Sequence, residues 1–188
     1  MDWLLSIVRV AGASFPVASS LVQLNSEIES KALLQRVAKL EDPISHLHEQ
    51  VPELSKHIYQ KIKETNSNSI EFADNFYKEY SRPLAALESQ KFIKGCHAIG
   101  KQFAAGLRVV DPSYIMYMCA LTEEAQKMEA LINKVDSCWV GKWINGVEIH
   151  ESLNIPLPVA QAVFEIYEDK GYGLCSKTIG EYKYMGKA

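Results

Sequence analysis

The sequence predicts a mainly helical α+β protein, in which an N-terminal helical segment precedes two similar units of helices and a small β-hairpin. Apolar residues recur at three- and four-residue steps through most of the 188 residues. Two hairpin signals, at Gly100 and Gly180, lie 80 residues apart. A hydrophobic content of 47% and a charged content of 23% are typical of a globular protein. We place the segment at residues 1–50, the first unit at 51–112 and the second unit at 113–188.

The first 24 residues are largely apolar, in the stretches 3–8 and 15–24. Arg9, Gly12 and Pro16 interrupt them, whereas a membrane-spanning helix needs roughly 20 mainly apolar residues. We therefore expect a buried or partner-facing helix here, with membrane association as the less favoured alternative. A second, amphipathic helix is predicted from residue 26 until the Glu-Asp-Pro sequence at 41–43.

Three helices are predicted for the first unit. Pro52 suits a first helical turn, and an apolar stripe at four-residue steps follows at Leu54, Ile58 and Ile62. A polar turn at 65–69 separates this helix from a second apolar stripe that runs from Ile70 to Tyr80.

The third helix begins at Ser81, a plausible cap, and leads into a hairpin with strands at 94–99 and 102–110 around Gly100-Lys101. Three short helices followed by a hairpin are the winged-helix arrangement. The segment 81–93 (SRPLAALESQKFI) resembles the third helix of the winged-helix superfamily. Lys91 departs from that pattern, because glycine is commonest there, and we expect the helix to end at Gly95 instead.

The second unit repeats this layout. Its sequence predicts one long helix with an apolar stripe from Tyr114 to Val135, a short helix over 147–153 and a turn at 155–158. A helix at 159–170 and a hairpin with strands at 174–179 and 181–185 follow. A shift of 80 residues aligns members of the two units, which indicates duplicated structure. The aligned residues are Glu88 with Glu168, Phe92 with Tyr172, and Ile99-Gly100 with Ile179-Gly180.

Catalytic and metal-binding patterns are missing from the sequence. It contains no phosphate loop, nucleophile elbow, dinucleotide fingerprint or zinc-protease motif. We interpret Cys96-His97 as a structural thiol beside a surface histidine, and His46 and His48 as loop residues. The four cysteines are scattered singly, as in a cytoplasmic protein with reduced thiols. We therefore expect a non-catalytic protein without a cofactor or a metal.

Charge is distributed unevenly along the chain. The first unit has a net charge of +2, from 9 Lys/Arg and 7 Asp/Glu, whereas residues 1–50 and 113–188 have net charges of −2 and −3. Five cations surround the third helix and the hairpin of the first unit: Arg82, Lys91, Lys94, Lys101 and Arg108. They are candidates for contacts with DNA phosphates, although the same residues also fit an ordinary solvated surface. The corresponding helix of the second unit is acidic and a poor groove reader, and Phe164, Ile166 and Tyr167 are expected to pack in a core or against a partner.

Three functions stay open at this level. The first is a winged-helix regulator that binds duplex DNA through the first unit. The second is an adaptor that binds protein partners through both units, and the third is an accessory protein that associates with membrane through residues 1–24. The N-terminal helices either cover the first unit or pair with a second copy, and we favour a homodimer.

Overall fold

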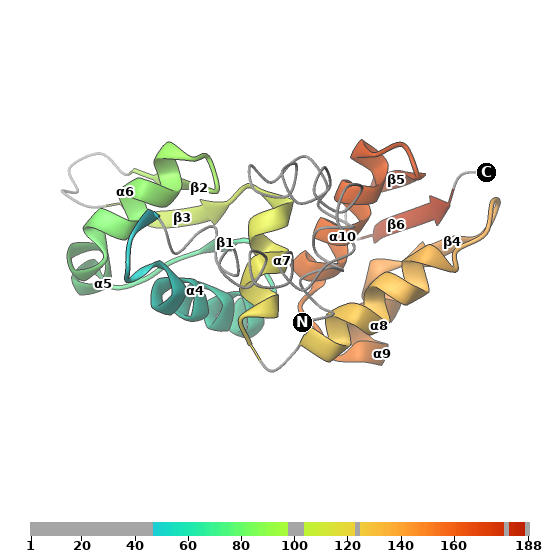
Figure 1. Ribbon diagram of the computed structural model, residues 1–188, viewed down its shortest axis with the longest axis horizontal. Helices are drawn as coiled ribbons and strands as arrows, with labels where there is room; N and C mark the ends of the chain where they lie inside the picture. Colours follow the sequence, from blue (N-terminus) through green and yellow to red (C-terminus); the bar gives the residue numbers. More distant parts are fainter. Residues whose placement is uncertain (1–46, 98–103, 123–124, 179–180, 187–188) are drawn as a thin grey trace, which may run out of the picture.

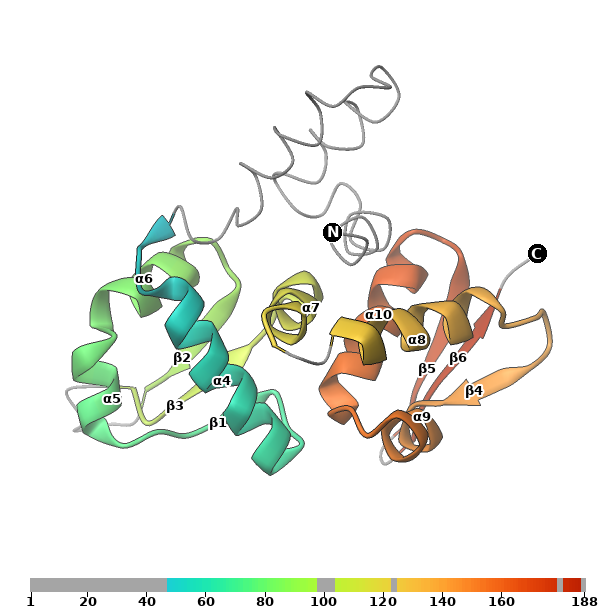
Figure 2. The same ribbon diagram turned by 60° about the horizontal axis from the view of Figure 1, so that its bottom comes forward.

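The computed structural model describes residues 47–97, 104–122, 125–178 and 181–186. Within them lie two small α+β units, which stand side by side with one helix between them (Figures 1 and 2). The predictions for residues 1–46, the tip of the first hairpin with Lys101, and Gly180 fall outside the described residues.

The two units have the same order of elements, helix–strand–helix–helix–strand–strand. The first unit comprises α4 (Val51–Thr65), β1 (Ser69–Ile70), α5 (Asp74–Glu79), α6 (Ser81–Ser89), β2 (Ile93–Cys96) and β3 (Gly106–Val109). The second comprises α8 (Ala125–Asp136), β4 (Trp143–Asn145), α9 (Gly146–Leu153), α10 (Leu157–Asp169), β5 (Gly173–Thr178) and β6 (Glu181–Gly186). The fold is therefore mainly helical α+β, as the sequence predicts.

Helix α4 follows directly from its sequence pattern. A proline occupies its first turn, and its predicted stripe of Leu54, Ile58 and Ile62 is completely buried. It ends at Asn66, which adopts a left-handed conformation with φ of 51° and donates its backbone N–H to the carbonyl of Ile62 at 2.8 Å. Asparagine tolerates this conformation better than most residues, so the predicted polar turn ends the helix.

Each unit has a third strand that the periodicity does not indicate. The sheet of the first unit (sheet A) has the order β1-β3-β2, and that of the second (sheet B) has the order β4-β6-β5, all antiparallel. Ile70, predicted to belong to the stripe of the second helix, instead lies in β1 opposite Leu107. A strand of two residues is too short for an alternating pattern, so only its pairing defines it.

The junction of α6 with β2 differs from the prediction. Helix α6 ends at Ser89 rather than at Gly95, because Lys91 adopts a left-handed conformation with φ of 63°. The equivalent residue of the second unit, 80 positions later, is Gly171 with φ of 76°. The helix start also differs: Ser81 is the first helical residue and not a cap, since only Tyr80 separates α5 from α6.

The glutamates aligned by the 80-residue shift have the same role in both units. Oε1 of Glu88 accepts the backbone N–H of Gly95 at 2.8 Å, and Oε1 of Glu168 accepts that of Cys175 at 2.8 Å. Both donors lie on strands at the edge of a sheet. Each glutamate therefore ties a helix to its hairpin and occupies an N–H that would otherwise be open to another strand.

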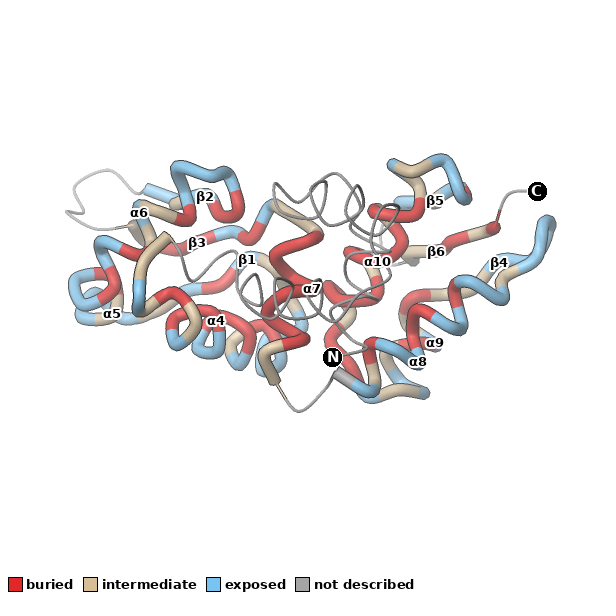
Figure 3. The backbone as a smooth tube through the Cα atoms, in the orientation of Figure 1, coloured by how far each residue is buried: buried red, intermediate tan, exposed pale blue. Residues whose placement is uncertain are grey.

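The long helix predicted from Tyr114 to Val135 is in fact two helices. Helix α7 (Pro112–Ala120) stops before Leu121, and α8 starts at Ala125. From Ser113 onward every residue of α7 is buried, because this helix packs between α10 on one side and α4 and β3 on the other. The apolar pattern runs through both helices and so conceals the break between them. Figure 3 shows α7 as a continuous buried segment at the centre of the molecule.

The hydrophobic core extends through both units by way of α7. Asp111 caps this helix, since its Oδ1 accepts the N–H of Tyr114 at 3.0 Å. The Oγ of Ser55 on α4 hydrogen-bonds to the Tyr114 hydroxyl at 2.8 Å within the core. None of the helices in the described residues is both long enough and apolar enough to cross a membrane.

Candidate functional site

Four of the five predicted phosphate-binding cations lie in the described residues, and all four are exposed. Arg82 is in the first turn of α6, Lys91 follows the end of that helix, Lys94 is in β2 and Arg108 is in β3. Lys101 lies outside the described residues. The cations thus follow α6 and the hairpin, the two elements from which the sequence predicts contact with DNA.

Lys94 and Arg108 are brought together by the register of sheet A. They are Cα partners, and Arg108 also pairs with Ser69 on its other side. Side chains of directly opposed residues share one face of an antiparallel sheet and lie about 5 Å apart at Cβ. We call Ser69, Arg108 and Lys94 the basic row. It occupies the outer face, because the neighbouring Ile70, Leu107, Ile93 and Val109 point into the core.

Two like charges opposed on a sheet destabilise it, and the described residues show no salt bridge to either cation. An anionic ligand across this face would relieve that repulsion. Lys91 adds a further exposed cation three residues before Lys94. The three cations outnumber exposed Glu71, which lies beside Gly106 on the same face of sheet A. The surface therefore has a local positive excess on a protein whose net charge is negative.

Helix α6 presents a small polar face to solvent. Only Pro83 and Leu87 of this helix are buried, while Ser81, Arg82, Ala85 and Ser89 are exposed. Arg82 lies nine residues before Lys91, about 13 Å along a helix axis, so cations stand at both ends of α6. Glu88 is the acidic residue of this helix, and its carboxylate is engaged by the N–H of Gly95.

Helix α10, the counterpart of α6, is covered. It packs against α7, and eight of its thirteen residues are buried, among them Phe164, Ile166 and Tyr167. The prediction that these three side chains pack in a core is confirmed. Because α7 lies against it, α10 cannot enter a DNA groove, whatever its charge.

Two of the three acidic residues of α10, Glu165 and Glu168, contact their own hairpin. The ammonium group of Lys177 on β5 lies 3.4 Å from Glu165 and 3.5 Å from Glu168. Although burial lowers the pKa of Lys177, the two carboxylates hold it above its usual value. Burial also raises the pKa of Tyr182, whose hydroxyl donates to Glu165. These two carboxylates are therefore engaged within the second unit.

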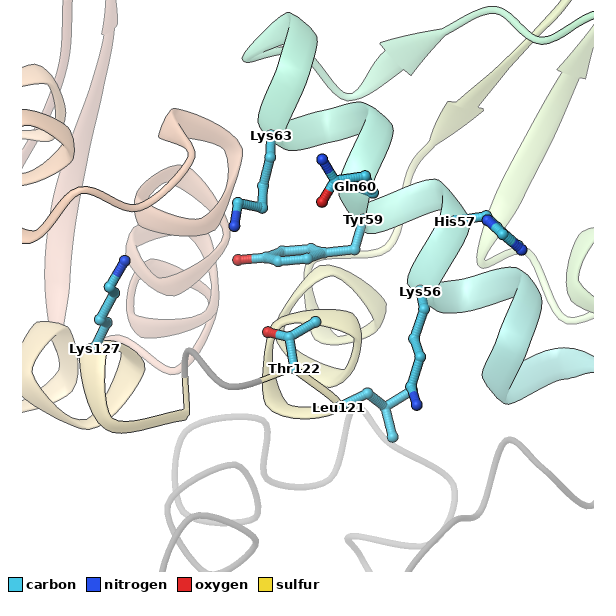
Figure 4. Close-up of a pocket in the computed structure, with 8 residues that line it drawn as sticks. All are labelled: Lys56, His57, Tyr59, Gln60, Lys63, Leu121, Thr122 and Lys127. Atoms are coloured by element: carbon cyan, nitrogen blue, oxygen red, sulfur yellow. The ribbon is translucent and has the colours of Figure 1, made fainter.

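A groove between the units escapes sequence reasoning. It encloses about 880 Å³ between α4 and the start of α8, and it is lined by Lys56, His57, Tyr59, Gln60, Lys63, Leu121, Thr122 and Lys127. In Figure 4, Lys63 and Tyr59 extend from α4 toward Lys127 on α8, while His57 points away. Lys63 and Lys127 are 64 positions apart in the chain, so no local pattern links them.

The polar groups of this groove already interact within the protein. The ammonium group of Lys127 donates to the carbonyl oxygen of Asn154 at 3.0 Å. Lys63, Tyr59 and Thr122 also have partners among the protein's own groups. The groove therefore lies at the junction of the two units, and its polar groups are engaged within the protein.

The histidines and cysteines form no cluster in the described part of the chain. No group of three or more His, Cys, Asp or Glu side chains there has the arrangement of a metal site. His97 is exposed, as predicted, but Cys96, predicted to be structural, is exposed as well. Cys175 is half-buried, and burial together with nearby Glu168 raises its pKa to about 12, which disfavours the nucleophilic thiolate.

No family model, curated protein or solved structure matches the chain, so its function has to be inferred from the geometry and the charge of its own surfaces.

Proposed function

We propose that this is a non-catalytic binding protein of two winged-helix-like units, which contacts the phosphate backbone of duplex DNA through the first unit. The observation that carries the proposal is the basic row, in which Lys94 and Arg108 are opposed on an exposed sheet face without an acidic partner among the described residues. Phosphate groups line both strands of a duplex, and lysine and arginine side chains are their usual partners in proteins.

The arrangement of helix and hairpin supports the same function. In helix-turn-helix proteins a recognition helix lies in the major groove while neighbouring elements contact the backbone. Helix α6 has an exposed face of small side chains with Arg82 in its first turn, and Lys91 and Lys94 follow it into the hairpin. The second unit has no equivalent surface, because α7 covers α10.

The experiment is a titration of the full chain with a labelled duplex, followed by fluorescence anisotropy at several salt concentrations. If Arg82, Lys91, Lys94 and Arg108 each contact one phosphate, log K should fall against log salt with a slope of about −3.6. The affinity should then drop about 150-fold between about 50 and 200 mM salt. Absence of binding at about 50 mM salt, or binding that does not weaken with salt, would refute the proposal. The adaptor function would then be the better explanation.

Charge reversal locates the interface. Lys94→Glu and Arg108→Glu should each weaken binding at least tenfold at low salt and should lower the salt slope. Lys56→Glu is the matched control, because Lys56 is also an exposed cation of the first unit but lies on α4, outside the basic row. If Lys56→Glu weakens binding as much as the other two variants, the basic row is not the site. Far-UV circular dichroism checks that all three variants are folded.

A further inference from the structure

The outer faces of the two sheets have opposite chemistry at equivalent positions. In sheet A the row that crosses all three strands is Ser69, Arg108 and Lys94. In sheet B the register places Trp143, Met185 and Leu174 in the same row, with Leu174 exactly 80 positions after Lys94. We call these three residues the apolar row. A duplicated fold thus carries a charged face in one unit and an apolar face in the other.

The apolar row contributes little to the core of its own unit. The opposite face of sheet B, with Ile144, Tyr184 and Cys175, packs against the core. Trp143 remains 44% exposed and Leu174 47% exposed on the outer face. Burying a side chain of this size is worth about 2 kcal/mol, so covering both would stabilise an assembly.

Exposed apolar residues continue into the turn before β4. Trp139 is 78% exposed and Val140 62% exposed, and Figure 3 shows this turn as exposed at the end of the molecule. Together with Trp143 and Leu174 they expose about 400 Å² of apolar side chain, as large as the greatest such patch on a typical monomer. Patches of this size on monomers often have a function.

We infer that the apolar row and the turn before β4 form the interface of a homodimer, with a second copy of this chain as the occupant. A standard interface buries about 800 Å² on each partner, of which a little over half is apolar. The exposed side chains of the apolar row and of the turn before β4 together supply about that share. No charged side chain lies within the row itself, and the nearest one on this face of β6 is Lys183, two positions before Met185. Two copies related by a two-fold axis can therefore oppose their apolar rows directly.

The position of sheet B agrees with this arrangement. It lies at the end of the molecule opposite the first unit, as Figures 1 and 2 show. A dimer formed through sheet B would leave the first unit of each copy at its outer ends. The interface does not depend on the proposed DNA contact, because it is formed by other residues and is measured without DNA.

The two units suggest the test themselves. The triple variant Trp143→Ser, Met185→Arg and Leu174→Lys gives sheet B the row that sheet A already carries at the equivalent positions. Sedimentation velocity of the full chain across the micromolar range should show twice the monomer mass for the wild type. The triple variant should dissociate at least tenfold more readily, and Leu174→Lys alone should act in the same direction.

Val110→Thr is the matched control, because Val110 is an exposed apolar residue of the first unit, 43% exposed, and lies outside the patch. It should dimerise like the wild type. A wild type that is monomeric throughout the range would overturn the inference, and the patch would then belong to another partner or to residues 1–24. So would a folded triple variant that dimerises normally. Circular dichroism and thermal unfolding establish that each variant is folded. If the triple variant is unfolded, the dissociation constant of Leu174→Lys provides the test instead.

Discussion

Lys91 follows the last turn of α6 with φ of 63°, a conformation that costs a residue with a Cβ about 1–2 kcal/mol. Glycine avoids this cost, but it makes the unfolded chain more flexible and so lowers the free energy of unfolding by about 0.5–1 kcal/mol. We therefore expect Lys91→Gly to increase the free energy of unfolding by about 0.5–1 kcal/mol. In a chain of this length that raises Tm by roughly 1–4 °C.

The second unit supplies the reverse experiment. Gly171 has φ of 76° at the equivalent position, and a Cβ placed there would meet no heavy atom within 4 Å. Gly171→Ala therefore introduces backbone strain without a steric clash, and it should lower the free energy of unfolding by about 1 kcal/mol. Urea or thermal unfolding of both variants beside the wild type measures the two effects.

Lys91→Ala separates the backbone from the side chain. It keeps the Cβ and the strain but removes the ammonium group, so the stability should stay within about 0.5 kcal/mol of the wild type. A loss of stability in Lys91→Gly, or an unchanged stability in Gly171→Ala, would refute the argument. Both Lys91 variants should weaken DNA binding equally if the side chain contacts a phosphate, so Lys91→Gly would gain stability while it loses affinity.

Three further predictions concern packing and protonation. Leu87, the fully buried leucine of α6, should cost about 2–5 kcal/mol when replaced by alanine, and denaturant unfolding of Leu87→Ala measures this loss. Burial raises the pKa of Asp111 against the hydrogen bonds from the backbone of Tyr114 and Ser113, so the folded protein binds this proton more tightly than the unfolded chain. Relative to Asp111→Asn, the wild type should therefore lose stability as the pH rises from below about 4 to neutrality; a constant difference in unfolding free energy between the two proteins would contradict this. Iodoacetamide at mildly alkaline pH should modify exposed Cys96 well before Cys175, whose pKa is raised to about 12, and peptide mass spectrometry that finds equal rates would exclude the protected thiol.

Local signals account for most of the secondary structure. The stripe of Leu54, Ile58 and Ile62, the proline at the start of α4 and the polar turn after it are all properties of neighbouring residues, and the structure follows them. The same holds for the hairpin of β5 and β6. Local signals failed where a long-range contact decides: β1 exists because Ser69 pairs with Arg108, 39 positions later.

The sequence by itself determined the fold class, the order of most elements and the uneven charge of the two units, because these depend on composition and on periods of a few residues. Only the tertiary structure decided which side chains share a surface. Strand register places Lys94 beside Arg108 and Trp143 beside Met185, although neither pair is close in the chain. The packing of α7 covers α10 and leaves α6 exposed, so two helices at equivalent positions differ in what they can reach. Packing and the pairing of non-consecutive strands join residues far apart in the chain, and the periodicity of neighbouring residues does not encode them.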